Sequence, residues 1–300
     1  MKQKRNNSLD PEFIASLKGF DLKAKTIVEG FISGLHKSPH HGFSVEFNQH
    51  KIYTPGDEIK SIDWIVYGKT DKFYVKQYEE ETNTSVFLMV DSSASMGYKY
   101  SSKITKFQYA LYLASAIGYL GLKQKDALGA LLFDTKIKQF IKPSSKLIQF
   151  QNIMSLFESA KVSSKTDFSK TLRLLAGRLK KRSLIVIFSD FLDDFEGLKK
   201  SLNLLKYKKH DILLFHILDD SELSFPFTHQ VKFIDKETNE ELMTDVNAVK
   251  DNYLSQFGDF LSNIKKYSLS RKMDYNLLRT STPFNVSLRD FLIKRKSINV

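Results

Sequence analysis

The stretch Val86–Met96 constrains the fold of this chain more than any other part of the sequence. Five apolar residues, Val86–Val90, run directly into the small polar series Asp91-Ser92-Ser93-Ala94-Ser95. A short apolar run that ends in small polar residues is typical of a strand buried on both faces, as in a parallel sheet. Because open α/β sheets bind ligands at the carboxyl ends of such strands, this strand end is where we expect a site.

Apolar runs of the same kind alternate with segments of helical periodicity through the rest of the chain. Buried strands are predicted at Asp126–Phe133, Ser183–Ser189, Asp211–Leu218 and Asp274–Arg279, with an antiparallel edge strand at Thr135–Ile141 and a hairpin at Val231–Asp235 and Glu241–Thr244. Helices are predicted at Ser102–Leu122, Lys146–Ser159, Thr166–Lys180, Phe195–Lys206, Val246–Tyr267 and Ser287–Lys294. This alternation predicts an α/β protein with a doubly wound, mostly parallel sheet of Rossmann type.

Residues 1–84 precede the first buried strand and are expected to form an N-terminal α+β extension. Asp10-Pro11-Glu12 is typical of a helix start, because Asp caps the helix and Pro fits its first turn. A second helix is predicted at residues 22–35, and two alternating segments predict strands: Gly42–Tyr53 and Lys72–Glu81. The sequence therefore predicts an extension at 1–84 and a main domain at 85–300.

The composition is that of an ordinary globular protein, with 42% hydrophobic and 27% charged residues. The chain has no cysteine, which excludes a disulfide framework, a thiolate metal site and cysteine catalysis. Its first residues carry no apolar signal segment, and the longest apolar stretch, Ala110–Leu122, is shorter than the roughly 18–20 residues that span a bilayer. We therefore expect a cytoplasmic protein with no membrane span.

The formal net charge of +12 lies entirely after residue 84, because residues 1–84 hold 12 Lys and Arg against 12 Asp and Glu. Such a charge attracts nucleic acid, an anionic membrane or an acidic protein surface. The basic runs lie near predicted helix ends, where cations complement the helix dipole: Lys180-Lys181-Arg182, Lys206-Tyr207-Lys208-Lys209 and Lys294-Arg295-Lys296. A solvated lysine-rich surface explains them better than a nucleic-acid site, for which salt-sensitive, Mg²⁺-independent DNA binding would be the sign.

Asp91, Ser93 and Ser95 alternate along the chain, so their oxygens can converge as the chain leaves the strand. Oxygen ligands suit a hard cation, and Mg²⁺ takes them in octahedral geometry at about 2.0–2.1 Å. The small number of ligands favours Mg²⁺ over Ca²⁺, and Mn²⁺ fits equally well. The plainer alternative is that these are turn and capping residues.

This pattern resembles the DxSxS metal-ion-dependent adhesion site of von Willebrand factor A domains. In that family a Thr from a later loop and an Asp at the end of another strand complete the site, and the matching positions here are Thr166 and Asp190. The resemblance implies a von Willebrand A-like fold and a metal site built from Asp91, Ser93, Ser95, Thr166 and Asp190. It also implies that the ion takes up a Glu or Asp of a partner protein, while some of the carboxylates act through waters.

Longer segments narrow the resemblance. HKSPHHGFSVEF, YTPGDEIKSIDW, YVKQYEEET and VDSSASM resemble the DUF58 family, bacterial proteins that carry a von Willebrand A-like domain and are often encoded beside MoxR-type AAA+ ATPases. The resemblance runs from about Ile27 to the C-terminus, and it implies a partner that is such an ATPase or its client, in assembly or maturation of protein complexes. The chain shows no Walker motif, so any ATP hydrolysis would be the partner's.

Enzymatic chemistry has less support in the sequence. A haloacid-dehalogenase-type phosphatase needs a second Asp two residues after the first, and Ser93 stands there. A serine hydrolase needs Gly-x-Ser-x-Gly, and the series from Ser93 to Gly97 lacks the first Gly. We expect a non-enzymatic interaction module, with a metal-dependent phosphoesterase and a metal-free scaffold as the alternatives.

Overall fold

The structure, a computed structural model, describes residues 9–36, 51–52, 67–68, 73–75, 85–163, 168–235 and 240–298. By their contacts, residues 1–32 and 84–300 form one compact unit, which we call the main unit, and residues 33–83 form a second. In the second unit, β1 (Lys51–Ile52) pairs antiparallel with β2 (Tyr74–Val75), each within a segment predicted to be a strand. The domain boundary predicted at residue 84 stays a prediction.

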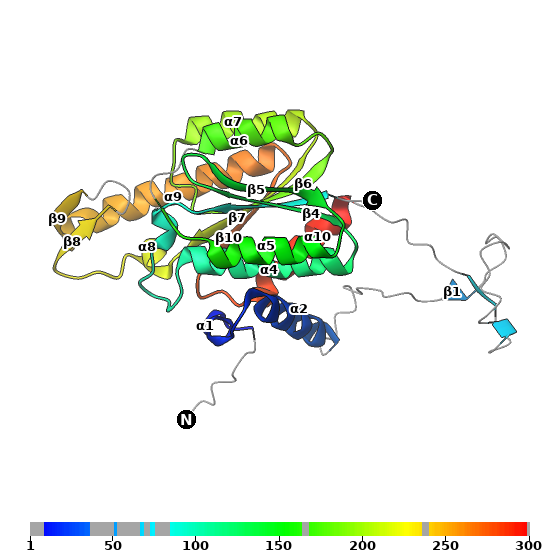
Figure 1. The fold of residues 1–300 in the computed structure, drawn as a ribbon. Helices are drawn as coiled ribbons and strands as arrows, with labels where there is room; N and C mark the ends of the chain where they lie inside the picture. Colours follow the sequence, from blue (N-terminus) through cyan, green and yellow to red (C-terminus); the bar gives the residue numbers. More distant parts are fainter. Residues whose placement is uncertain are drawn as a thin grey trace, which may run out of the picture. The chain divides into compact units, whose positions relative to one another are not determined.

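A six-stranded sheet lies at the centre of the main unit, with the strand order β10-β7-β6-β3-β4-β5 (Figure 1). The strands are β3 (Ser85–Asp91), β4 (Ala127–Phe133), β5 (Ile137–Ser144), β6 (Ser183–Ser189), β7 (Asp211–Leu218) and β10 (Asp274–Arg279). All neighbours pair parallel except β4 and β5, which pair antiparallel. The predicted α/β class with a mostly parallel sheet is therefore confirmed, and β5 is the predicted antiparallel edge strand.

Helices cover both faces of this sheet (Figure 1). One face carries α4 (Lys106–Lys123), α5 (Ile148–Ser159) and α10 (Phe284–Ile298), and the other carries α6 (Phe168–Arg178), α7 (Phe195–Tyr207) and α9 (Val246–Ser270). Side chains alternate between the faces of a strand. In β3, Phe87 and Met89 therefore join the apolar core with Leu172 of α6 and Leu198 of α7, whereas Leu88 faces Gly118 of α4.

The remaining elements of the described chain are short, apart from α2. Helix α1 (Pro11–Ser16) begins as predicted at Asp10, whose carboxylate accepts from the Glu12 amide. The others are α2 (Phe20–His36), η2 (Ser95–Gly97), α8 (Asp220–Ser224) and the predicted hairpin of β8 (Gln230–Ile234) and β9 (Glu241–Asp245). No helix in the described ranges has the length and apolar character that crossing a membrane requires.

Helix α4 begins four residues later than the sequence pattern predicts. Thr105 is its N-cap, and it forms a capping box in which Thr105 and Gln108 each bond the other's backbone amide, at 3.1 and 3.0 Å. The capping box fixes the first helical position at Lys106, which points its side chain into the protein, where it is 1% exposed. Residues 98–105 thereby become a loop, and its Tyr100 and Ser101 amides reach Asp219 at the end of β7.

The strand order reverses between β3 and β6. From β3 the chain continues to β4 and β5 on one side, and it then returns to add β6, β7 and β10 on the other. Ligands of open α/β sheets bind at such a switch point, because the loops there leave in opposite directions and open a crevice. Asp91 ends β3 and Asp190 follows β6, so the fold brings both carboxylates to this point.

Candidate functional site

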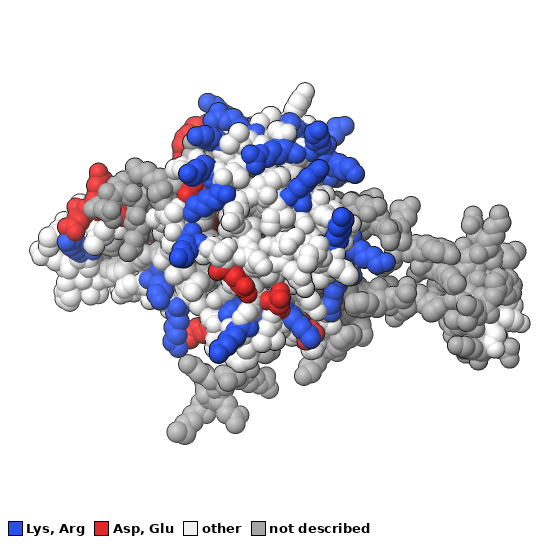
Figure 2. All heavy atoms as spheres, viewed as in Figure 1, with Lys and Arg blue, Asp and Glu red and all other residues white. Residues whose placement is uncertain are grey.

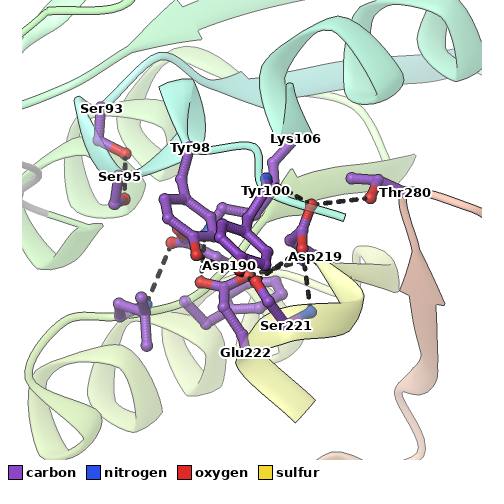
Figure 3. Close-up of polar contacts among 12 residues, drawn as sticks. Ser93, Ser95, Tyr98, Tyr100, Lys106, Asp190, Asp219, Ser221, Glu222 and Thr280 are labelled. Atoms are coloured by element: carbon purple, nitrogen blue, oxygen red, sulfur yellow. Dashed lines mark hydrogen bonds and ion pairs between the residues drawn. The ribbon is translucent and has the colours of Figure 1, made fainter. Parts of the chain in front are cut away.

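Four of the five residues predicted to hold a metal lie together at the switch point, and Figure 3 shows Ser93, Ser95 and Asp190 among them. The Ser93 amide donates to Asp91 Oδ1 at 2.9 Å, and the Ser93 and Ser95 hydroxyl oxygens lie 3.0 Å apart. The Ser95 hydroxyl also lies close enough to the Asp190 carboxylate to lower the pKa of that carboxyl. We call these four residues the strand-end group. The fifth predicted ligand, Thr166, lies outside the described residues.

Asp91 is buried beside a second carboxylate. Burial, followed by the negative charge of Asp190, raises the pKa of Asp91 to about 7. Ser189 works against this shift, because its hydroxyl donates to Asp91 Oδ2 at 2.6 Å while accepting from the Phe191 amide at 2.9 Å. The high pKa means that the anionic form of Asp91 lacks full compensation, and a cation placed here would stabilise it.

Lys106 enters the site from the first turn of α4, and the sequence analysis did not single it out. Its ammonium lies 2.8 Å from Asp190 Oδ2 and 2.7 Å from Glu222 Oε1 (Figure 3). Burial disfavours the charge of Asp190, but the ammonium, together with the Ser95 hydroxyl and the Leu192 amide, outweighs burial and holds the pKa of that carboxyl below its usual range. The sequence does carry one signal, since a lysine in the first turn of a helix opposes the helix dipole and needs a partner elsewhere.

Asp219, the fully buried N-cap of α8, ties the loop after the strand-end group to the carboxyl end of β7. Its carboxylate accepts from the amides of Tyr100 and Ser101 at 3.1 and 3.0 Å and from the amide and hydroxyl of Ser221 at 2.9 and 2.7 Å. Burial alone would raise its pKa, but these hydrogen bonds lower the pKa to about 2. Sequence patterning gave no sign of this role, because Tyr100 and Ser101 are more than a hundred residues away in the chain.

Asp219→Asn should loosen this loop. The amide group keeps one acceptor oxygen but no charge, so we expect the Tyr100 and Ser101 amides to exchange with deuterium about tenfold faster or more. Hydrogen exchange read by mass spectrometry measures this, with Asp220→Asn, which removes the exposed ion pair with Arg279, as the matched control. Equal exchange in the two variants would contradict the role of Asp219.

The lowered pKa of Asp219 also makes its contribution to stability depend on pH. Asp219 stabilises the fold above about pH 4 and loses that contribution as the pH falls through about 2.

The strand-end group fits a small hard cation in its chemistry. Two ligands that are adjacent on an octahedron of about 2.1 Å radius lie about 3.0 Å apart, and the Ser93 and Ser95 hydroxyl oxygens are separated by 3.0 Å. The group offers two carboxylates and two hydroxyls, all oxygen. In the ranges that the structure describes, no three His, Asp or Glu side chains form a metal cage, so an ion here would depend on the serine hydroxyls.

Comparison with known proteins identifies a family. The model of the family described as "Protein of unknown function DUF58" matches residues 49–259. Uncharacterized proteins of Mycobacterium bovis (Mb1516) and Mycobacterium tuberculosis (Rv1480) are each 25% identical over 233 residues, which is 76% of this chain and 72% of theirs.

Solved structures resemble the chain only distantly. The conserved hypothetical protein BatB from Bacteroides thetaiotaomicron has a TM-score of 0.47 at 12% identity, covering 71% of this chain and 99% of its own. An aerotolerance-related membrane protein from Bacteroides fragilis gives the same values. The family match does not depend on them, and since it spans more than half of the sequence, the chain belongs to the DUF58 family.

Proposed function

We propose that this chain is a non-enzymatic interaction module that binds an acidic side chain of a partner protein through a cation of the Mg²⁺ type. The observation that carries the proposal is the convergence of Asp91, Ser93, Ser95 and Asp190 at the switch point between β3 and β6. These residues would hold the ion, with Thr166 as the fifth ligand. A bound Mg²⁺, or Mn²⁺ or Ca²⁺ in its place, supplies a coordination position that accepts a carboxylate oxygen.

The finer assignment of the fold belongs to the same proposal. A DxSxS series directly after a central parallel strand, with an Asp at the end of the neighbouring strand, supports a von Willebrand A-like domain with a metal-ion-dependent adhesion site. The charge of the chain supports an acidic partner, because the formal net charge is +12 and basic side chains gather over α6 and α7 in the view of Figure 2. The resemblance of the sequence segments to DUF58 proteins supports a MoxR-type AAA+ ATPase, or its client, as that partner.

Loss of metal binding in Asp91→Asn tests the cation site directly. The substitution keeps the shape of the side chain but removes one charge from the strand-end group, so we expect Mn²⁺ and Mg²⁺ to bind at least about tenfold more weakly. Isothermal titration calorimetry on the full chain measures the affinity. Asp211→Asn is the matched control, because Asp211 is the first residue of β7, at the amino end of the strand and away from the switch point, and pairs with Arg182. Unchanged binding in Asp91→Asn would rule out this site.

One observation favours a second function, a metal-free scaffold. The Lys106 ammonium already neutralises part of the carboxylate charge at Asp190. Co-purification of the chain with the MoxR-type ATPase, in Mg²⁺ and again in EDTA, separates the two functions. Binding of the ATPase that is lost in EDTA and in Asp91→Asn supports the metal bridge. Binding that is unchanged in EDTA and in Asp91→Asn supports the scaffold.

A further inference from the structure

The Lys106 ammonium lies in a buried cluster of charge that extends the strand-end group. Its two partners come from different elements, since Asp190 follows β6 and Glu222 belongs to α8. The side chain of Lys106 is 1% exposed, and those of Asp190 and Glu222 are 2% and 14% exposed. We call Asp91, Asp190, Glu222 and Lys106 the charge cluster. An ammonium buried this deeply between two carboxylates is a fixed part of the site, because moving it away would leave the two buried carboxylates without a positive partner.

Other contacts hold this ammonium in place. The Glu222 carboxylate accepts from the Asp219 amide at 2.7 Å through its second oxygen, which fixes the carboxylate that faces Lys106. The Tyr98 ring lies beneath the ammonium, at 5.7 Å from the nitrogen to the ring centroid. The Tyr253 hydroxyl donates to the Glu222 carbonyl oxygen at 2.9 Å and anchors α8. Lys106 therefore has one defined position, 2.8 Å from a carboxylate oxygen of the strand-end group.

The charge of the cluster decides what the site accepts. When a bound cation keeps all three carboxylates anionic, their three negative charges and the one positive charge of Lys106 give a formal −2, which matches a divalent cation. Without Lys106, the same site holding a divalent cation would keep a net negative charge and repel an incoming carboxylate. With Lys106, the loaded site would be neutral and would not repel an incoming carboxylate. The ammonium thus weakens the hold on the cation and favours the acidic ligand.

We propose that Lys106 is the specificity-determining residue of this site: it lowers the affinity of the chain for a divalent cation and raises the affinity of the loaded site for a carboxylate. This inference rests on the proposed function, because it concerns the same cation site. Beyond the proposed function, the inference assigns the net charge of the cation site to Lys106 of α4 and to its second partner, Glu222.

Mn²⁺ titrations of the full chain test the inference. Lys106→Met removes the ammonium and should bind Mn²⁺ about tenfold more tightly or better, whereas Glu222→Gln removes a carboxylate and should bind it more weakly. Lys103→Met is the matched control, because Lys103 is exposed and pairs with Glu12 at 2.8 Å. Calorimetry gives the affinities, and circular dichroism confirms that each variant is folded. If Lys106→Met does not fold, Glu222→Gln carries the test.

Acetate added to the Mn²⁺-loaded chain tests the second half of the inference. A carboxylate that replaces a metal-bound water lowers the water-proton relaxation rate. We expect a clear decrease in the wild type and in Lys103→Met, and a smaller decrease in Lys106→Met. An equal decrease in all three would contradict the role of Lys106 in accepting the anion.

The outcomes separate the two proposals. Equal Mn²⁺ affinity in wild type, Lys106→Met and Glu222→Gln, together with loss in Asp91→Asn, overturns the role of Lys106 and leaves the cation site standing. Absence of Mn²⁺ binding in the wild type and in every variant overturns the cation site, and the inference fails with it. Binding by Lys106→Met but not by the wild type supports the inference in its strongest form.

Discussion

Lys106→Met should lower the free energy of unfolding by about 3–5 kcal/mol, because removing one member of a buried ion pair leaves the other charges uncompensated. The methionine replaces the methylene chain of Lys106 but cannot pair with Asp190 Oδ2 or Glu222 Oε1, which now lie 2.8 and 2.7 Å from the ammonium. Urea denaturation followed by circular dichroism measures the loss in EDTA, where divalent cations do not contribute.

Lys103→Met provides the comparison for this loss, since it removes the same type of side chain three residues earlier. The Lys103 side chain is 81% exposed, and surface ion pairs of this kind contribute little to stability. We expect its unfolding midpoint to remain close to that of the wild type. If Lys106→Met is as stable as Lys103→Met, the buried ion pairs of Lys106 do not hold the switch point together.

His216→Phe should flatten the dependence of stability on pH between about 3 and 6.5. Burial, helped by the nearby Lys106 ammonium and opposed by the charge of Asp190, lowers the pKa of His216 from 6.5 to about 3. Over this range His216 is protonated in the unfolded chain but stays neutral in the folded chain. The stability of the wild type therefore falls as the pH drops from 6.5 toward 3. The pKa difference corresponds to a loss on the order of 5 kcal/mol.

Phenylalanine keeps the ring of His216 among its aromatic neighbours. Phe191, Phe260 and Tyr275 each meet the imidazole edge to face, with centroids 5.2, 6.1 and 5.7 Å away. The Tyr275 hydroxyl, 2.9 Å from Nδ1, would lose its partner, so we expect a modest loss at neutral pH alongside the flatter profile. Urea unfolding at a series of pH values measures this, with the exposed His229→Asn as the control. An unchanged slope in His216→Phe would assign the acid sensitivity to other groups.

The central strand and the residues that follow it were predictable from the sequence because they are local. A short apolar run with no polar residue is typical of a strand buried on both faces, and Val86–Val90 is fully buried in the sheet. Asp91, Ser93 and Ser95 then lie together because they are neighbours along the chain. Ser183–Ser189 has the same pattern, and Asp190 follows it, so the two strand ends could be expected at one edge of the sheet.

The start of α4 marks where local pattern stops being sufficient. Periodicity extends a helix back to Ser102, but the side chains of Thr105 and Gln108 bond to backbone amides and begin it at Lys106. A capping box decides between a loop and a further helical turn by satisfying amides that the helix leaves unpaired. That choice places Lys106 at the switch point and leaves residues 98–105 free to reach Asp219.

The amino-acid sequence by itself determined the layer architecture, the buried strands and the carboxylate and hydroxyl groups at the strand ends, because each depends on residues close together in the chain. Only the tertiary structure decided which charges meet. Lys106 pairs with Asp190 and Glu222, which lie 84 and 116 residues away. Such pairings depend on strand order, and hydrophobic periodicity does not encode strand order. A lysine that is 1% exposed becomes stable only when the fold supplies carboxylates from two other elements.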